Sequence, residues 1–83
     1  MFAKSTGRPH GVYVDSAGNI YVVDIFYAGI YVFNSSLTHQ TIIGEYGTET
    51  GKLRSPTDLI ILNDGSILVT NTRNERIERF SGI

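Results

Sequence analysis

Two histidines, His10 and His39, are the first candidates for zinc ligands in this 83-residue sequence, which contains no cysteine. A catalytic zinc site takes about three protein ligands around an open coordination position. His10 lies in the segment 9–12, where a strand is predicted to begin, whereas His39 lies far along the chain near a predicted outer strand. We therefore expect His10 to be a turn histidine that binds no metal, and we expect the chain to use no cofactor.

Signatures of nucleophilic and nucleotide chemistry are absent from the sequence, which has no serine-nucleophile, phosphate-loop or dinucleotide-binding motif. Arg73, Arg76 and Arg79 lie close together, but Glu75 and Glu78 alternate with them and cancel much of their charge. The whole chain has 7 Lys and Arg against 8 Asp and Glu, a net charge of -1. No apolar stretch reaches the roughly 18 residues of a membrane span. These features predict no enzyme activity, no nucleic-acid partner and no membrane partner.

An internal repeat in the sequence predicts the fold that carries these candidate residues. The segment from Pro9 to Phe33 returns as Pro56 to Phe80, an offset of 47 residues with no gap. Six pairs are identical: Pro9 and Pro56, Gly18 and Gly65, Ile20 and Ile67, Val22 and Val69, Ile30 and Ile77, Phe33 and Phe80. A repeat of this length is typical of arrays of one supersecondary unit.

Each copy has the composition of short strands rather than helices. β-Branched and aromatic residues gather in short runs, and Gly18 and Gly65 lie in the gaps of two predicted hairpins, where a positive φ angle is required. The predicted strands are 12–14, 20–23, 30–33 and 41–43 in the first copy, with 59–62, 67–69 and 77–80 in the second. Four short antiparallel strands per unit match the size of a propeller blade.

The repeated pattern resembles the NHL repeat of β-propellers. The first copy supplies Pro9, Gly11, Val12, Val14, Asp15, Gly18, Asn19, Ile20, Tyr21, Val22, Asp24, Ile30 and Phe33. The second copy supplies Pro56, Gly65, Ile67, Val69, Asn74, Arg76, Ile77 and Phe80. Tyr27 and Gly29 depart from the Asn and Arg that the family favours, and Asn71 replaces its Asp, so a polar tie between the second and third strands is expected to be weaker. Asp24, Asn71 and Arg76 are expected to be structural hydrogen-bonding residues.

The resemblance implies an all-β fold of propeller blades, each a four-stranded antiparallel sheet. We expect a single segment over residues 1–83, with one blade over 9–47 and a second blade over 56–83 that lacks its outer strand. The apolar run 59–62 favours strands that are covered on both faces, with Ile61 and Val69 buried between blades. Residues 1–3 are interpreted as the end of an outer strand from a preceding blade.

Blade number then raises the question of closure, because a closed propeller has about four to eight blades. Two blades leave an apolar sheet face open at each end. The chain is therefore expected either to be part of a longer propeller or to assemble as a homo-oligomer, such as a trimer with a ring of about six blades. In such a trimer three copies of His10 would surround one axis and could bind a metal ion.

Binding or assembly is the function that the resemblance implies, with no catalysis in this chain. Loops at one end of the blades are expected to supply the binding surface, which gives the candidates Phe26, Tyr27, Arg73 and Asn74. The partners are other blades or a protein ligand. The alternative is part of a zinc-dependent lyase or hydrolase, since the segment 9–12 is similar to one in the peptidylamidoglycolate lyase propeller and would offer His10 as a ligand. The sequence does not indicate a compartment.

Overall fold

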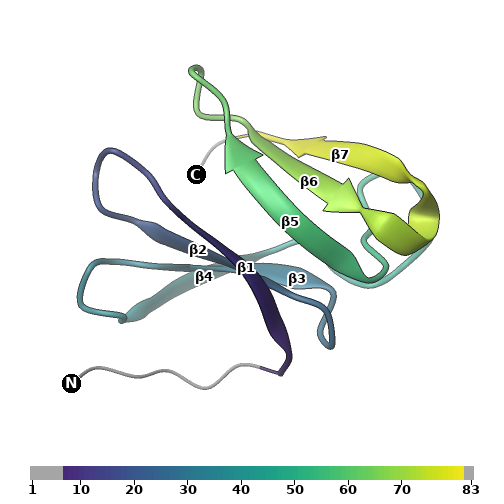
Figure 1. Ribbon diagram of the computed structural model, residues 1–83, viewed down its shortest axis with the longest axis horizontal. Coiled ribbons are helices and arrows are strands. Elements are labelled where there is room, and N and C mark those ends of the chain that lie inside the picture. Colours follow the sequence, from purple (N-terminus) through teal and green to yellow (C-terminus); the bar gives the residue numbers. More distant parts are fainter. Residues whose placement is uncertain (1–6, 82–83) are drawn as a thin grey trace.

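Two antiparallel sheets make up the computed structural model of the protein, which describes residues 7–81 (Figure 1). The first sheet has the strand order β1-β2-β3-β4 and the second has the order β5-β6-β7. The strands are β1 (Pro9–Val14), β2 (Ile20–Asp24), β3 (Gly29–Phe33), β4 (His39–Ile43), β5 (Pro56–Ile61), β6 (Ile67–Asn71) and β7 (Arg76–Phe80). A 3-10 turn, η1 (Thr72–Asn74), joins β6 to β7. The interpretation of residues 1–3 lies outside the described residues.

The repeat in the sequence is also a repeat in the structure. Strands β1, β2 and β3 begin and end 47 positions before β5, β6 and β7, respectively. The register shift between Pro9 and Gly11 in the first sheet recurs between Pro56 and Asp58 in the second. The all-β prediction is therefore confirmed, and each residue of β1, β2 and β3 has a structural equivalent in β5, β6 and β7.

Hairpin turns at Gly18 and Gly65 connect the first two strands of each sheet. Both glycines have a positive φ, +88° and +87°, in the region that side-chain-bearing residues rarely adopt. The Gly18 amide donates to the Asp15 carbonyl, and the Gly65 amide donates to the Leu62 carbonyl. The predicted turn chemistry is confirmed at both positions.

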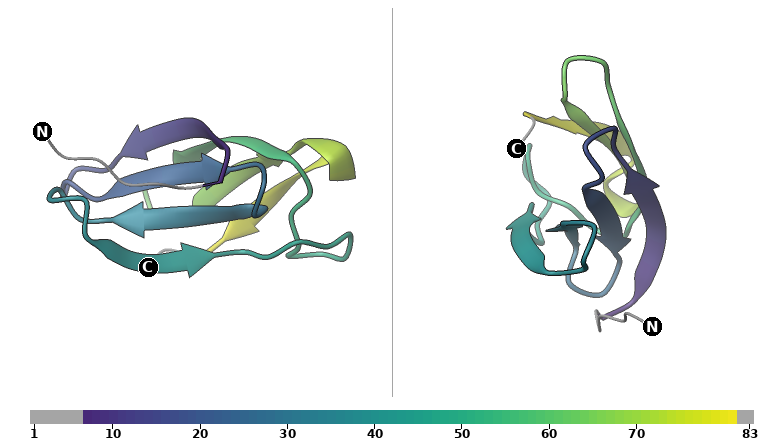
Figure 2. Two further views of the ribbon diagram at one scale, coloured as in Figure 1. Left: turned by 90° about the horizontal axis from the view of Figure 1, so that it is seen from below. Right: turned by 90° about the vertical axis from the view of Figure 1, so that its left-hand side faces the viewer.

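The core lies between the two sheets, and its buried strand residues come mainly from β2, β3, β5 and β6. Tyr21, Val23, Ile30 and Val32 point from the first sheet, and Leu59, Ile67 and Val69 point from the second. Figures 1 and 2 show the sheets as inclined layers, and β5 packs against β1 and β2 where they meet. Successive strand residues point to opposite faces of a sheet, so only one face of each sheet enters this core.

The connection from β4 to β5 supplies a core residue that the sequence analysis did not identify. Leu53 is fully buried between the sheets, while Tyr46, which is bridged to it, is 68% exposed. The Leu53 amide donates to the Glu45 carbonyl at 2.9 Å, and the Gly47 amide donates to the Leu53 carbonyl at 3.0 Å. The Leu53 side chain also lies so close to Gly44 that a Cβ there would be 2.7 Å from it. This segment therefore closes one edge of the core.

Each sheet has a second face that points away from the core. We call this face of the first sheet the head face; its exposed apolar residues are Val12, Val14 and Ile42, with Ile20 and Val22 half-buried beside them. We call the outer face of the second sheet the tail face; it comprises Asp58, Ile60, Leu68, Thr70, Ile77 and Arg79. Val12 is 66% exposed and Ile77 is 64% exposed, so both faces present large apolar side chains to solvent.

Burial of the run 59–62 differs from the expectation in two places. Val69 is fully buried as predicted, but Ile61 is only half-buried, because it lies at the end of β5 beside an open groove between the hairpin turns. Ile60 is 51% exposed because its side chain belongs to the tail face. The run is therefore covered on one face rather than on both.

Replacement of Leu53 tests the unexpected part of this core. Leu53→Ala is expected to lower the free energy of unfolding by about 2–5 kcal/mol, because it leaves a cavity between the sheets. Tyr46→Ala is the matched control on the same bridge and should change it by less than about 0.5 kcal/mol, since Tyr46 is exposed. Urea unfolding measures both, and equal losses would contradict the placement of Leu53.

Candidate functional site

The innermost strands of the two sheets are joined at equivalent positions of the repeat. His10 on β1 lies with its Nδ1 2.8 Å from the backbone oxygen of Thr57 on β5, the residue 47 positions later. A carbonyl oxygen can only accept, so Nδ1 carries the hydrogen, and in the neutral ring Nε2 is the unprotonated nitrogen. The histidine is exposed, and this bond ties the two sheets together at their inner edge.

A close backbone approach lies directly beside that hydrogen bond. A Cβ on Gly11 would be 3.0 Å from Oδ1 of Asp58, 3.3 Å from the Thr57 oxygen and 3.5 Å from the Asp58 Cα. Gly11 and Asp58 are again equivalent positions of the repeat. The absence of a side chain at Gly11 therefore allows β1 and β5 to meet with an aspartate on the other side.

Asp24 and Asn71 are equivalent buried polar residues that hold the chain entering each sheet. The Asp24 carboxylate accepts from the backbone amides of Gly7, Arg8 and Tyr27, at distances of 2.6 to 3.1 Å. The Asn71 side chain accepts from the Arg54 amide at 2.8 Å through Oδ1 and donates to the Lys52 carbonyl at 2.7 Å through Nδ2. Their predicted structural role is confirmed by these contacts.

The 47–52 segment is fastened to the second sheet by a polar cluster on η1 and β7. Asn74 donates to the Gly47 carbonyl at 2.9 Å, and Arg76 donates to the carbonyls of Thr48 and Glu49. Glu78, which is buried, pairs with Arg76 and accepts from the Gly51 amide at 3.0 Å. The hydrogen bond from Arg76 and the Gly51 amide outweigh burial and hold the pKa of Glu78 below its ordinary value.

The first sheet carries aromatic residues where the second carries this polar cluster. Tyr27 and Tyr31 are the equivalents of Asn74 and Glu78, and Gly29 is the equivalent of Arg76. Tyr27 therefore has no side-chain amide like that of Asn74, and the weaker polar tie between the second and third strands stays a prediction. The pKa of Tyr31 is raised, mainly by burial and also by the nearby Asp24 and Tyr27.

The four predicted binding residues lie at the same end of the two sheets, in the connections that follow β2 and β6. Phe26 is 70% exposed and Tyr27 is 56% exposed, and their rings meet edge to face with centroids 4.9 Å apart. Arg73 is exposed, whereas Asn74 is half-buried and uses its amide on the 47–52 segment. The first three are available to a partner, and binding by all four stays a prediction.

The opposite end of the molecule has a polar groove between the two hairpin turns. It has a volume of about 460 Å³ and is lined by residues that include Asp15, Tyr21 and Asp64. Asp15 is partly desolvated there, but hydrogen bonds from Asn19, Tyr21 and the Ala17 amide hold its pKa below the ordinary value. Burial and Asp15 raise the pKa of Tyr21 to about 12. Asp15 is thus an ionised turn residue with its oxygens already engaged.

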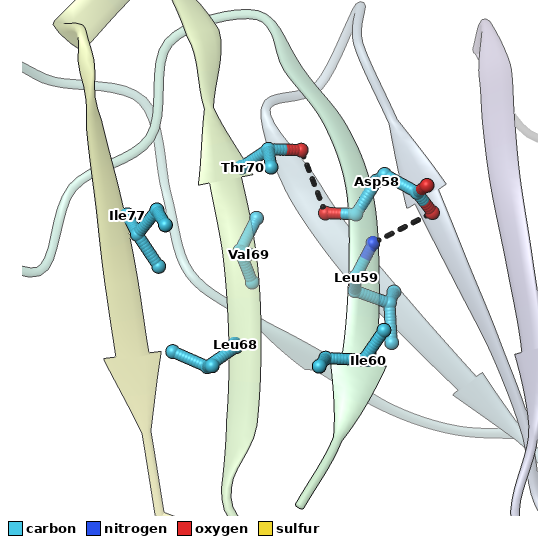
Figure 3. Close-up of a pocket in the computed structure, with 7 residues that line it drawn as sticks. All are labelled: Asp58, Leu59, Ile60, Leu68, Val69, Thr70 and Ile77. Atoms are coloured by element: carbon cyan, nitrogen blue, oxygen red, sulfur yellow. Dashed lines mark hydrogen bonds between the residues drawn. The ribbon is translucent and has the colours of Figure 1, made fainter.

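The tail face carries an apolar hollow with a volume of about 170 Å³. Figure 3 shows side chains from three neighbouring strands around it, with Ile60 on β5, Leu68 on β6 and Ile77 on β7. The equivalent place on the first sheet is lined by Tyr21, Val23 and Ile30 and is buried by the second sheet. The hollow is therefore an open copy of a site that is filled elsewhere in the chain.

Among the side chains that the structure describes, which exclude those of residues 39 and 40, no group of three or more His, Cys, Asp or Glu is placed to hold an ion. His10 has Nε2 as its unprotonated nitrogen, but one chain brings no second ligand to it in the part that the structure describes. His39 lies on the outer strand β4. Residues 7–81 contain no helix long and apolar enough to cross a membrane.

Exchange of the two buried polar residues tests their different hydrogen-bond roles. Asn71→Asp loses the donor to the Lys52 carbonyl and sets two oxygens against each other. Asp24→Asn places a donor among backbone amides that already donate. Each change is expected to lower the free energy of unfolding by about 1–3 kcal/mol in chemical denaturation. Unchanged stability in both variants would contradict the assigned bonds.

Acid should weaken the fold partly through Glu78. A carboxyl whose pKa is lowered in the folded state stabilises the fold above its ordinary value of 4.5, and this contribution is lost as the pH falls through the lowered pKa. We expect Glu78→Gln to be less stable than the wild type near about pH 7 and to lose less stability below about pH 4.5. Glu49→Gln, at an exposed position, is the control, and urea unfolding across this range is the measurement. Parallel pH profiles for wild type and Glu78→Gln would refute the role.

Comparison with known families identifies the first repeat. Residues 6–35 match the NHL repeat. A search of the curated proteins found no match to the chain. The second sheet repeats the strands of the matched region at an offset of 47 residues. The chain therefore contains an NHL repeat, in residues 6–35, and its four-stranded and three-stranded sheets are consistent with NHL propeller blades.

Proposed function

We propose that this chain is a non-catalytic propeller scaffold whose function is to bind other protein blades and, through them, to assemble. The single observation that carries this proposal is the exposed apolar side chains on the outer faces of both sheets, which include Val12, Ile60 and Ile77. The head face and the tail face are equivalent to the two faces that form the core between the sheets. Surfaces that are buried inside the chain recur on its outside, which is what a unit of a stacked array presents.

The blades that cover these faces belong either to a longer chain or to a homo-oligomer such as a trimer. Propellers close with about four to eight blades, and three chains of two blades would make a ring of about six. Exposed apolar faces of this size are favourable to bury, because each large side chain removed from water contributes roughly 1.5–3 kcal/mol.

A protein ligand would be bound by the connections after β2 and β6. Phe26 and Tyr27 combine a rigid apolar surface with a hydroxyl group, and Arg73 adds a charge at the equivalent place on the neighbouring sheet. Aromatic and arginine side chains carry much of the binding energy of protein interfaces. Asn74 supports this surface by holding the adjacent segment in place.

The second candidate function is a zinc-dependent lyase or hydrolase that uses His10. The hydrogen bond from Nδ1 to the Thr57 oxygen favours it, because it orients the ring and leaves Nε2 for a metal. Such a site would take its other ligands from other blades. We prefer the scaffold because the polar side chains described above, within residues 7–81, form hydrogen bonds within turns and between chain segments.

Zinc analysis separates the two functions. Purified protein, incubated with zinc and desalted, is expected to carry well below one ion per three chains by elemental analysis. His10→Ala should then have the same zinc content as the wild type. Zinc at one ion per chain that is lost in His10→Ala would instead favour the zinc-dependent function.

A further inference from the structure

One asparagine of the chain has both the neighbours and the free side-chain nitrogen that N-linked glycosylation requires. Asn34, Ser35 and Ser36 form the pattern Asn-X-Ser, with X not proline, which marks an acceptor for oligosaccharide transfer. We propose that Asn34 is an acceptor site for an N-linked oligosaccharide and that the folded turn accommodates the glycan. This inference does not depend on the proposed function, because it concerns a turn away from the candidate binding residues.

The acceptor segment lies in the turn between β3 and β4. Asn34 directly follows β3 and is half-buried, whereas Ser35, Ser36 and Thr38 are exposed. The turn lies beside the hairpin between β1 and β2 (Figure 1), and a Cβ on Gly18 would be 3.9 Å from the Cβ of Ser35. The segment is therefore at the surface, where a bulky and hydrated sugar belongs.

The fold uses the carbonyl end of the Asn34 side chain and leaves its amide nitrogen free. Oδ1 accepts from the backbone amides of Ser36 and Thr38, each at 3.0 Å. Nδ2 donates no hydrogen bond to any group within residues 7–81. Attachment of a sugar to Nδ2 keeps the carbonyl and one N–H, so both bonds of the turn remain in the glycosylated chain.

The transfer is a substitution at the first carbon of the sugar. Its co-substrate is an oligosaccharide joined through a diphosphate to a lipid. A bond forms between Nδ2 of Asn34 and that carbon, and the bond from the carbon to the diphosphate oxygen breaks. The lipid diphosphate leaves with the bonding electrons, and Nδ2 gives one proton to a base of the transferase. The Ser36 hydroxyl is the second group that the acceptor pattern supplies to the enzyme.

The other four asparagines of the chain do not meet these requirements. None is followed by serine or threonine two positions later. In three of them Nδ2 already donates a hydrogen bond within the fold; these are Asn19, Asn71 and Asn74. The fourth, Asn63, is exposed but is followed two positions later by Gly65, so it provides a matched control.

A glycan on Asn34 leaves the candidate binding surface open. The turn follows β3, whereas Phe26 and Tyr27 lie in the connection that precedes β3, so they are at opposite ends of this strand. The connection after β6 is also on the far side of the molecule from this turn (Figure 1). The sugar would therefore cover the end of the first sheet that carries its hairpin turn.

Transfer in vitro tests the acceptor site. The full chain, unfolded in urea and diluted into purified oligosaccharyltransferase and a lipid-linked oligosaccharide, should gain one glycan by mass spectrometry. Asn34→Gln and Ser36→Ala should each reduce this product by about tenfold or more, because each removes one part of the acceptor pattern. Ser36→Thr retains the hydroxyl and should keep the product, and Asn63→Gln should give the same yield as the wild type.

Refolding of the glycosylated chain tests whether the turn accommodates the sugar. Because Oδ1 of Asn34 keeps its bonds, the strand signal in circular dichroism should equal that of the unglycosylated chain carried through the same steps. A wild-type chain that gains no glycan would overturn the proposal, as would a glycan that persists in Asn34→Gln. A glycosylated chain that regains less strand signal than its unglycosylated reference would overturn it as well.

Discussion

The meeting of β1 and β5 is the constraint on which the rest of the structure depends. Two sheets can share a core only if their inner strands approach closely, and here Gly11 has no side chain that would hold β1 away from Asp58. The neighbouring bond from His10 to the Thr57 oxygen fixes the register of that approach. Because both contacts join positions 47 residues apart, the repeat aligns the sheets with each other as well as repeating them.

Much of the fold could be predicted from the sequence because its signals are local or repeated. The hairpin turns at Gly18 and Gly65 could be predicted because a positive φ angle depends only on the turn itself. The burial of Val69 could be predicted from the alternation of apolar residues along its strand. Leu53 could not be found in this way, since its burial depends on where the 44–55 connection crosses the edge of the core. The prediction that Ile61 is buried was wrong for a related reason. An apolar run indicates burial, but the neighbouring turns decide which end of the strand is covered.

The candidate site was harder to predict, because exposure and hydrogen bonding are properties of the folded chain. Phe26, Tyr27 and Arg73 could be named as candidates because they lie in the connections after the second strand of each sheet. Asn74 has the same place but turns its amide to the Gly47 carbonyl, a partner 27 residues away. The direction of an amide toward a distant carbonyl has no signature in composition or spacing. The bond between His10 and Thr57 was likewise invisible until the two inner strands were placed side by side.

The two sheets differ most in the side chains at the positions of Asn74, Arg76 and Glu78 and their equivalents in the first sheet. In the second sheet, Asn74, Arg76 and Glu78 bind the 47–52 segment through its backbone, so that connection is held by polar contacts. In the first sheet, Tyr27 and Tyr31 replace two of these residues, and their rings lie 6.4 Å apart in a line that continues to Phe33. A polar cluster is specific for one backbone segment, whereas an aromatic surface accepts any apolar partner of suitable shape. The 47–52 connection is therefore fixed to the second sheet by an amide, a guanidinium and a carboxylate that the first sheet lacks at the equivalent positions.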